Sequence, residues 1–249
     1  MKKLIKIGLY NPFLDTLGGG EKHILSIIAT LSNIILEENK DVEINIFWND
    51  DLSKKIEERF SNLELKKINW ISNFKNLSLL KRFQYLFSFD YFFYVTDGSY
   101  FFSLAKKNFV FCMVPDKKLY QLNLINKLKL FNFKFISNSP FTSVWLKKWG
   151  IKSITIEPYI DNKFISNSQK KEKIILSVGR FFSHLHQKNH QEIIKTFINL
   201  QKNGRLFKEY KLILAGGLKN EDKNYFEHLK KLANKNTSII FKPNINDKQ

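Results

Sequence analysis

The chain of 249 residues contains a single cysteine, Cys112, and only four arginines. One cysteine excludes an internal disulfide and fits a reducing compartment such as the cytoplasm. No run of about 18 uncharged apolar residues occurs, so a membrane-spanning helix is not expected. The first residues are basic and then apolar, as in a signal peptide. Because Lys6 interrupts the apolar run, a first β-strand fits them better.

The net charge of +18 invites comparison with nucleic-acid-binding proteins. The cations are nearly all lysines, however, whereas specific phosphate and base recognition tends to use the guanidinium fork of arginine. A generally lysine-rich surface is therefore the first interpretation, and contact with an anionic membrane surface is the second. No nucleic-acid partner is expected, and a basic nucleic-acid-binding protein stays as the weaker alternative.

Short apolar segments alternate with longer amphipathic ones, which predicts an α/β fold with a parallel sheet covered by helices on both faces. The strands expected in the first part of the chain are Ile5–Leu9, Glu43–Phe47, Phe92–Val95, Phe109–Met113, Phe135–Ser137 and Ser153–Ile156. The helices expected there are Gly20–Glu38, Leu52–Phe60, Leu77–Phe87, Leu119–Phe131 and Pro140–Trp149. Together they predict an N-terminal Rossmann-like domain over residues 1–158.

A polar linker, residues 159–172, separates this domain from a second alternation over residues 173–249. The elements expected there are strands Ile174–Val178, Leu212–Ala215 and Ser238–Phe241 and helices Asn189–Asn203 and Asp222–Asn236. Three strands leave an open sheet with a long unpaired edge and a half-covered face. The second Rossmann-like domain is therefore expected to be incomplete.

The strongest chemical signal is a pair of cations near the first strand of the second domain. Gly179 and Arg180 follow that strand, and Lys188 and Asn189 stand at the start of the next helix. Ligands of open α/β sheets bind at the carboxyl ends of the strands. Arg180 and Lys188 therefore predict a phosphate or diphosphate site.

Glycines follow two other strands. Those between the first strand and the first long helix, just before Glu21, are Gly18, Gly19 and Gly20. Bare backbone N–H groups and the positive end of a helix favour a bound oxygen there. Gly216 and Gly217 follow the strand Leu212–Ala215, where they serve either a ligand or an ordinary turn. The spacing is not that of the GxGxxG fingerprint, which argues against a Rossmann oxidoreductase.

Acidic and histidine residues give weaker signals. Asp97 follows a strand and is expected to line the same edge of the sheet as the glycines. His184 and His186 are two residues apart, but no cluster of Asp, Glu or Cys lies near them in the sequence, so metal ligation is not expected.

Taken together, the motifs resemble those of the family 4, or group 1, glycosyltransferases of the GT-B fold. The matching segments, in the family's order, are Asn11–Phe13, Gly18–Glu21, Ile136–Thr142, Pro158–Asp161, Val178–Arg180, Lys188–His190 and Ala215–Gly217. The resemblance implies two Rossmann-like domains facing a cleft. It also implies that the N-terminal domain binds the acceptor and the C-terminal domain binds a nucleotide sugar.

The resemblance implies roles for individual residues. Arg180 and Lys188 are the catalytic cations on the donor diphosphate, and further donor contacts come from Gly179, Asn189, Gly216 and Gly217. The acceptor side is expected to include Gly18, Gly19, Gly20, Glu21, Asp97 and Ser139. Such enzymes typically retain the anomeric configuration and need neither a metal nor another cofactor, since two cations stabilise the departing diphosphate. The lack of a DxD-like motif agrees with this.

The expected function is glycosyl transfer from a nucleotide sugar to a saccharide or lipid-linked acceptor in the cytoplasm, as in cell-envelope polysaccharide biosynthesis. The stretch Leu77–Phe87 is apolar and basic; such a stripe usually packs in a core, and the alternative is a place on the inner face of a membrane. The family's E-x7-E region has no counterpart, and Met113–Asp116 occupies the place of its acceptor-side histidine. A non-catalytic module that binds only an acceptor or partner is therefore the alternative function.

Overall fold

The structure is a computed structural model that describes residues 2–120, 122–160, 170–183, 188–204 and 207–245. The chain divides into two compact units, Met1–Ile165 and Ser166–Gln249. The division falls inside the stretch expected as a linker, residues 159–172, of which residues 161–169 lie outside the described part. Each unit is described by itself.

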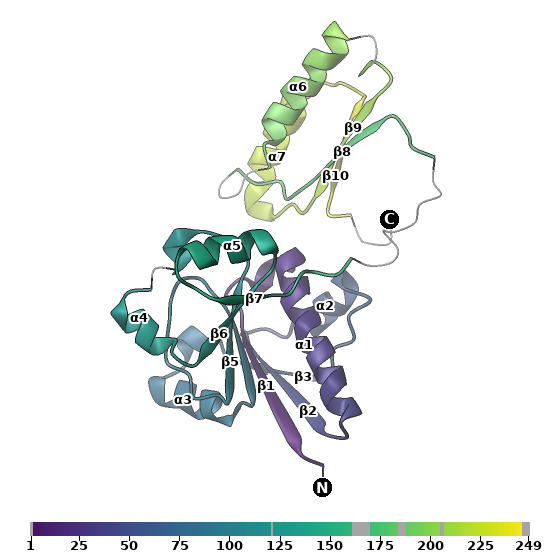
Figure 1. Ribbon diagram of the computed structural model, residues 1–249. Helices are drawn as coiled ribbons and strands as arrows, with labels where there is room; N and C mark the ends of the chain where they lie inside the picture. The colour runs from purple at the N-terminus through teal and green to yellow at the C-terminus, as the bar shows by residue number, and fades with distance from the viewer. Residues whose placement is uncertain (1, 121, 161–169, 184–187, 205–206, 246–249) are drawn as a thin grey trace. The chain divides into compact units, whose positions relative to one another are not determined.

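The first unit is built on a seven-stranded sheet in the order β3-β2-β1-β4-β5-β6-β7 (Figure 1). Its strands are β1 Leu4–Tyr10, β2 Asp41–Phe47, β3 Ile68–Ile71, β4 Tyr91–Val95, β5 Lys107–Cys112, β6 Phe133–Ser137 and β7 Ser153–Thr155. All neighbouring strands are parallel. The strand order reverses between β1 and β4, and open α/β sheets bind ligands at such a reversal.

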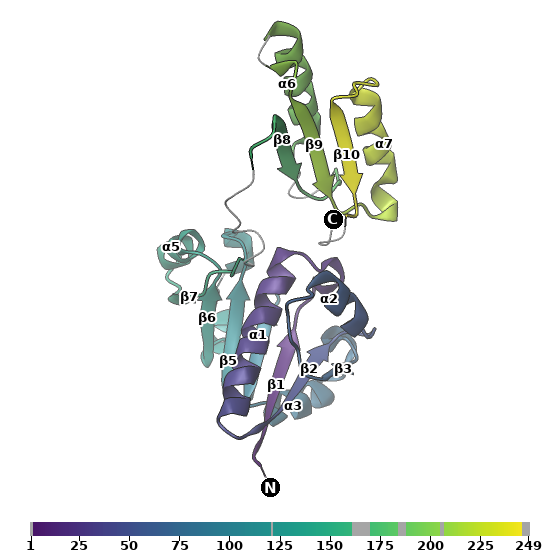
Figure 2. The same cartoon turned by 90° about the vertical axis from the view of Figure 1, so that its right-hand side faces the viewer.

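Helices cover both faces of this sheet, as Figure 1 shows, and Figure 2 looks onto the side of α1. The first face is covered by α1 (Gly19–Glu37) and α2 (Ser53–Arg59), through buried residues such as Ile24, Ile28 and Ile56. The second face is covered by α3 (Leu79–Ser88), α4 (Leu124–Lys129) and α5 (Pro140–Lys148), through Leu86, Leu130 just after α4, and Leu146. The α/β prediction with both faces covered is confirmed.

Two details of the first unit differ from the prediction. The helix expected over Leu119–Phe131 is wrong, because the chain forms a 3-10 turn at Lys117–Tyr120 and starts α4 separately. The side chain of Asn123 accepts a hydrogen bond from the backbone N–H of Asn126 (2.8 Å) and so caps this new start. Strand β3 was not predicted, because four residues at a sheet edge are defined by pairing with β2 rather than by a pattern of their own.

The expected core position of Leu77–Phe87 is wrong for most of its apolar side chains. Within α3 only Leu86 is buried, and the large side chains on the other side of the helix, such as Leu80 and Phe87, face solvent. The helix therefore packs through a narrow contact and leaves an apolar stripe outside.

The second unit has a three-stranded parallel sheet in the order β10-β9-β8. Its elements are β8 Ile174–Val178, α6 His190–Asn203, β9 Lys211–Gly216, α7 Lys223–Leu232 and β10 Ile239–Pro243. The helices and strands share one core that includes Phe181, Phe197, Leu214 and Leu229. Helix α7 ends earlier than expected, because Asn234 and Lys235 adopt left-handed backbone angles. No helix in the described parts of either unit is both long and apolar enough to cross a bilayer.

Candidate functional site

In the second unit, the chain continues past the end of β8 alongside β9. The N–H of Gly179 donates to the carbonyl oxygen of Ala215 (2.8 Å), and the N–H of Phe181 donates to that of Gly217 (2.9 Å). Arg180 stands between these two hydrogen bonds. Its backbone is therefore fixed at the carboxyl edge of the sheet, where the sequence placed it.

The glycines at this edge are set by close packing. A Cβ atom at Gly216 would stand 1.9 Å from the carbonyl oxygen of Gly179, so no other residue fits there without a backbone shift. A Cβ atom at Gly179 would stand 2.5 Å from Cγ of Lys188, so the Lys188 side chain lies directly against this glycine. At Gly217 the corresponding atom would be 3.6 Å from Cγ of Arg180, an ordinary contact. The glycines thus bring both cations to one edge.

Arg180 and Lys188 are both exposed, and among the described residues neither takes part in an ion pair. The guanidinium carbon of Arg180 lies 5.2 Å from the ring centroid of Phe182, a cation–π contact that leaves the nitrogen donors free for an anion. Phe181, the other aromatic residue of this segment, is fully buried in the core. Within the described part of the chain, the two cations of this site therefore have no protein counter-charge.

Helix α6 begins directly after Lys188 and Asn189. Asn189 has left-handed backbone angles (φ 52°, ψ 31°), which turn the chain into the helix. His190 follows, fully buried and stacked on Phe181 with ring centroids 5.0 Å apart. Burial lowers the pKa of His190, although contact with the Gly179 backbone opposes the shift, so the ring is neutral at pH 7. The buried ring anchors the turn that carries Lys188.

One residue of this edge was missed by the sequence reasoning. Asn244, just after β10, donates its backbone N–H to the carbonyl oxygen of Gly216 (2.9 Å). Its side-chain oxygen accepts from the N–H of Leu218 (2.7 Å). Asn244 thus holds the loop of Gly216 and Gly217 in place. The available signal was an asparagine directly after the last strand, a residue type that tolerates the left-handed backbone seen here.

In the first unit, the glycine segment forms the start of α1. The backbone N–H of Gly18 donates to the carboxylate of Glu21 (2.7 Å) in a capping box, and Glu21 is buried. A Cβ atom at Gly20 would stand 2.2 Å from Sδ of Met113, whereas one at Gly19 would have no neighbour within 4 Å. Glu21 and Gly20 therefore have structural reasons to be there, and Gly19 is the member of the segment that faces open space.

Asp97 lies after β4, next to the end of β1. It accepts hydrogen bonds from the hydroxyl of Tyr94 (2.7 Å), from Nζ of Lys75 (2.9 Å) and from the backbone N–H (3.0 Å) and hydroxyl of Ser99. Burial alone would raise the pKa of Asp97, but the hydrogen bonds from Lys75, Ser99 and Tyr94 outweigh it and lower the pKa to about 2. Asp97 is thus ionised, and its hydrogen bonds hold the loop after β4 in place. Its partner Lys75 was not identified from the sequence.

Ser139 caps α5 after β6. Its hydroxyl oxygen accepts from the backbone N–H of Thr142 (3.2 Å). The neighbouring Asn138 donates from its side chain to the carbonyl oxygen of Met113 (2.8 Å), which joins the ends of β5 and β6. The structure therefore gathers the predicted residues of the first unit at the carboxyl edge of its sheet, and those of the second unit at the carboxyl edge of the smaller sheet.

With this geometry in place, residues 159–249 match the family model described as Glycosyl transferases group 1. The match lies in the second unit and the residues just before it, so the likeness to group 1 glycosyl transferases concerns that part of the chain. The matched region contains Gly179, Arg180, Lys188 and Gly216. The part of the chain that is similar to this family is therefore the part that holds the two cations.

A solved structure has a similar fold. The "S. aureus MnaA-UDP co-structure" matches with a TM-score of 0.52 and 12% identity, over 99% of this chain and 70% of that chain. At this identity the likeness concerns the fold alone, which is GT-B-like with two Rossmann-type sheets. A search of the curated proteins gave no match.

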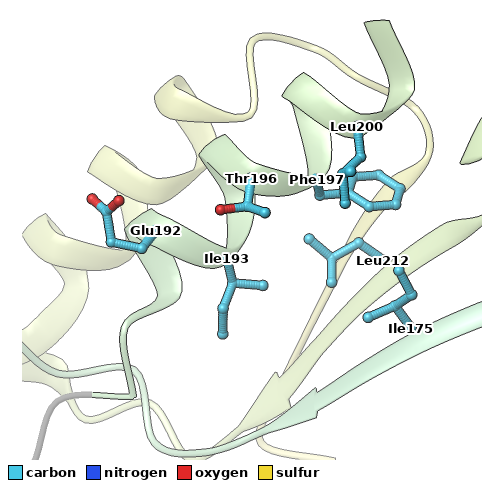
Figure 3. A pocket seen from close by; sticks show the side chains of 7 residues that line it. All are labelled: Ile175, Glu192, Ile193, Thr196, Phe197, Leu200 and Leu212. Atoms are coloured by element: carbon cyan, nitrogen blue, oxygen red, sulfur yellow. The ribbon is translucent and has the colours of Figure 1, made fainter. Parts of the chain in front are cut away.

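A pocket in the second unit lies apart from the predicted site residues. It has a volume of about 310 Å³ and is lined by Ile175, Glu192, Ile193, Thr196, Phe197, Leu200 and Leu212, from α6, β8 and β9 (Figure 3). Its walls are nearly all apolar, and it contains none of the predicted site residues. Within the described parts of the chain, no group of three or more His, Cys, Asp or Glu side chains is arranged to hold a metal ion. His184 and His186 lie outside the described residues.

Proposed function

We propose that this protein is a glycosyl transferase that moves a sugar from a nucleotide-sugar donor to a saccharide or lipid-linked acceptor. The supporting observation is the packing of Arg180 and Lys188 around Gly179 and Gly217. Two exposed cations at the carboxyl edge of a parallel sheet, without counter-charges among the residues that the structure describes, suit a diphosphate. The remaining donor contacts in this proposal come from the backbone of Asn189 and Gly216.

The two cations also have a role in the reaction. When the bond between the anomeric carbon and the diphosphate oxygen breaks, negative charge develops on the departing diphosphate. The fork of Arg180 and the ammonium of Lys188 stabilise that charge, and their positions are set before the donor arrives. In this proposal the transfer retains the anomeric configuration and uses neither a metal ion nor another cofactor, because the cations take the electrostatic role.

The acceptor belongs to the first unit in this proposal. The starts of α1 and of the loop at Asp97 flank the place where the strand order reverses, between β1 and β4. Gly19 leaves its backbone open there, and a sugar hydroxyl is the kind of group that an exposed N–H binds. The capped helix start at Ser139 adds a third strand end to the same edge.

A cytoplasmic role in cell-envelope polysaccharide biosynthesis, in the cytosol or at the inner face of a membrane, completes the proposal. Nucleic acid is not among the proposed partners. The solved structure of similar fold is described as a complex with UDP, so UDP is the first nucleotide to test.

The test is ligand-detected NMR of the full chain with UDP, GDP, ADP and NAD. We expect one nucleoside diphosphate to bind, and we expect the double variant Arg180→Ala/Lys188→Ala to weaken it about 100-fold, because two charged contacts are lost. The matched control, Lys208→Ala/Lys231→Ala, removes two exposed lysines of the same unit and should bind normally.

The outcomes separate the alternatives. Equal weakening in both double variants would mean that general positive charge, and not a built site, attracts the nucleotide. Nucleotide binding without turnover of any nucleotide sugar, in the presence of candidate acceptors, would identify a binding module and reject the transfer reaction. Binding of NAD alone would point to the oxidoreductase alternative.

A further inference from the structure

Helix α3 carries a stripe of large apolar side chains on its solvent side. The stripe has the spacing i, i+1, i+4 and i+8, which places all four on one side of the helix. These side chains are 40–72% exposed: Leu79, Leu80, Phe83 and Phe87. An amphipathic surface helix normally buries such a stripe, whereas α3 leaves it exposed to solvent.

Helix α4 and the residues after it repeat the pattern. The exposed fractions are 61–84% for Leu124, Ile125, Leu128 and Phe131. The first three have the spacing i, i+1 and i+4, again one side of a helix, and the fourth follows just after the helix ends. Two neighbouring elements of one sheet face therefore present apolar side chains to solvent.

The segment between β4 and β5 connects the two stripes. Helices α3 and α4 lie on the same side of the sheet, opposite α1 (Figure 1). The N–H of Lys106 donates to the carbonyl oxygen of Phe89, just after α3 (3.1 Å), and the side chain of Asn132, just after α4, donates to that of Ser103 (2.8 Å). Leu104, between these contacts, is itself exposed. The stripes and this segment form one surface, called the α3–α4 surface below.

The charge around the α3–α4 surface is of one sign. No Asp or Glu occurs between Glu64 and Asp90 or between Asp116 and Glu157, two stretches that include α3, α4 and α5. The cations in these stretches are Lys66, Lys67, Lys75, Lys81, Arg82, Lys117, Lys118, Lys127, Lys129, Lys134, Lys147, Lys148 and Lys152. Helices α1 and α2 on the opposite face, by contrast, carry several glutamates. The sequence thus sorts its charges by face.

We propose that the α3–α4 surface binds an anionic lipid bilayer. Apolar side chains enter the boundary between headgroups and acyl chains, and the surrounding lysines contact the negative headgroups. A second copy of the chain does not suit this surface, because pairing it with itself would bring like charges together. The inference goes beyond sugar transfer and does not depend on it, since the binding needs no nucleotide.

The test is co-sedimentation of the full chain with vesicles, without nucleotide. The vesicles contain either phosphatidylcholine alone or phosphatidylcholine with phosphatidylglycerol. We expect at least tenfold tighter binding to the anionic vesicles, decreasing as salt is raised. Phe87→Ser/Phe131→Ser should reduce binding to anionic vesicles at least tenfold. Leu4→Ser/Ile34→Ser, which changes two exposed apolar residues away from the surface, should not.

A second pair of variants tests the charge. Lys127→Gln/Lys129→Gln on α4 should weaken binding to the anionic vesicles several-fold, and Lys54→Gln/Lys55→Gln on α2 should leave it unchanged. Equal effects of both lysine pairs, or binding unaffected by Phe87→Ser/Phe131→Ser, would overturn the proposal. Self-association without lipid that disappears in Phe87→Ser/Phe131→Ser would replace the bilayer by a second copy. Unchanged nucleotide binding in all these variants keeps the result separate from the proposed sugar transfer.

Discussion

The carbonyl oxygen of Gly179 occupies the space that a side chain at Gly216 would need. A Cβ atom at residue 216 would be 1.9 Å from this oxygen, far inside van der Waals contact. The two glycines let the ends of β8 and β9 touch, and the hydrogen bond from the N–H of Gly179 to Ala215 locks them together. Arg180, one residue further on, takes its position from this contact.

We expect Gly216→Ala to destabilise the second unit by about 1–3 kcal/mol and to displace Arg180, because a backbone atom cannot move aside as a flexible side chain can. Gly217→Ala is the matched control: its Cβ atom meets only Cγ of Arg180, at 3.6 Å, and should leave the stability within about 0.5 kcal/mol of the original. Equal stabilities of the two variants would contradict the conclusion that close packing against Gly179 requires a glycine at residue 216.

The measurement can separate the two units. All four tryptophans, Trp48, Trp70, Trp145 and Trp149, lie in the first unit, so their fluorescence reports unfolding there. Amide hydrogen exchange of β8 and β9 reports the second unit. Gly216→Ala should lower the protection of β8 and β9 from amide hydrogen exchange. The denaturant midpoint of the first unit, followed by tryptophan fluorescence, should not change.

Gly19→Ala separates a structural role of the glycine segment from a ligand-binding role. No atom lies within 4 Å of the added Cβ, and alanine is favoured over glycine within a helix, so the stability of the first unit should be unchanged or rise by up to about 1 kcal/mol. If the segment binds the acceptor as proposed, the methyl group should raise the acceptor KM at least several-fold. Denaturation followed by tryptophan fluorescence, combined with transfer kinetics, checks both; an unaltered KM would remove Gly19 from the acceptor site.

Asp97→Asn tests the role of this ionised carboxylate through its pH dependence. The folded-state pKa of Asp97 is about 2, below its ordinary value, so its stabilising effect is complete at neutral pH and is lost as pH falls toward 2. Asp97→Asn should therefore lower the free energy of unfolding by about 2 kcal/mol at pH 7. The difference in unfolding free energy between the variant and the original chain should decrease steadily below about pH 4. Urea denaturation at several pH values measures this difference. A difference that stays constant between pH 7 and pH 3 would show that lost packing, not lost charge, is responsible.

His190 predicts an acid sensitivity of the second unit at a higher pH than that of Asp97. Burial lowers the pKa of His190 in the folded chain. As the pH falls below about 6.5, the unfolded chain therefore binds a proton at this histidine more readily than the folded chain does. The stability of the second unit should therefore fall as pH drops from 7 to 5. His190→Leu, which keeps a similar volume without a titrating group, should remove this slope, as measured by exchange protection of α6. Persistence of the slope in the variant would assign it to another group.

Much of the fold was predictable because apolar periodicity is a local property. Strand β8 was predicted with its observed bounds, and α1 and α6 to within one residue, since burial of one helix face or of a whole strand shows directly in residue spacing. Strand β3 and the division of Leu119–Phe131 were not predictable in this way. The first depends on pairing with β2, and the second on a cap at Asn123 within a stretch that looks helical throughout.

The candidate site was only partly visible in the sequence. Arg180 and Lys188 were identified by their positions near a strand end, and the structure places Lys188 against Gly179 and Arg180 next to Gly217. Asp97 was predicted to line the edge, but its oxygens are already occupied by Lys75, Tyr94 and Ser99. Lys75 lies 22 residues from Asp97 in the chain, so no spacing rule could have joined them.

The sequence by itself determined the alternation of strands and helices, the strand-end positions of the glycines and cations, and the sorting of acidic residues away from α3–α5. These are properties of order along the chain. Only the tertiary structure decided which glycines are there for packing, that Glu21 and Asp97 serve their own loops, and that the stripe on α3 faces outward. Those outcomes depend on atoms brought together from distant segments, because packing and hydrogen bonding act over a few ångströms in space and not over residues in sequence.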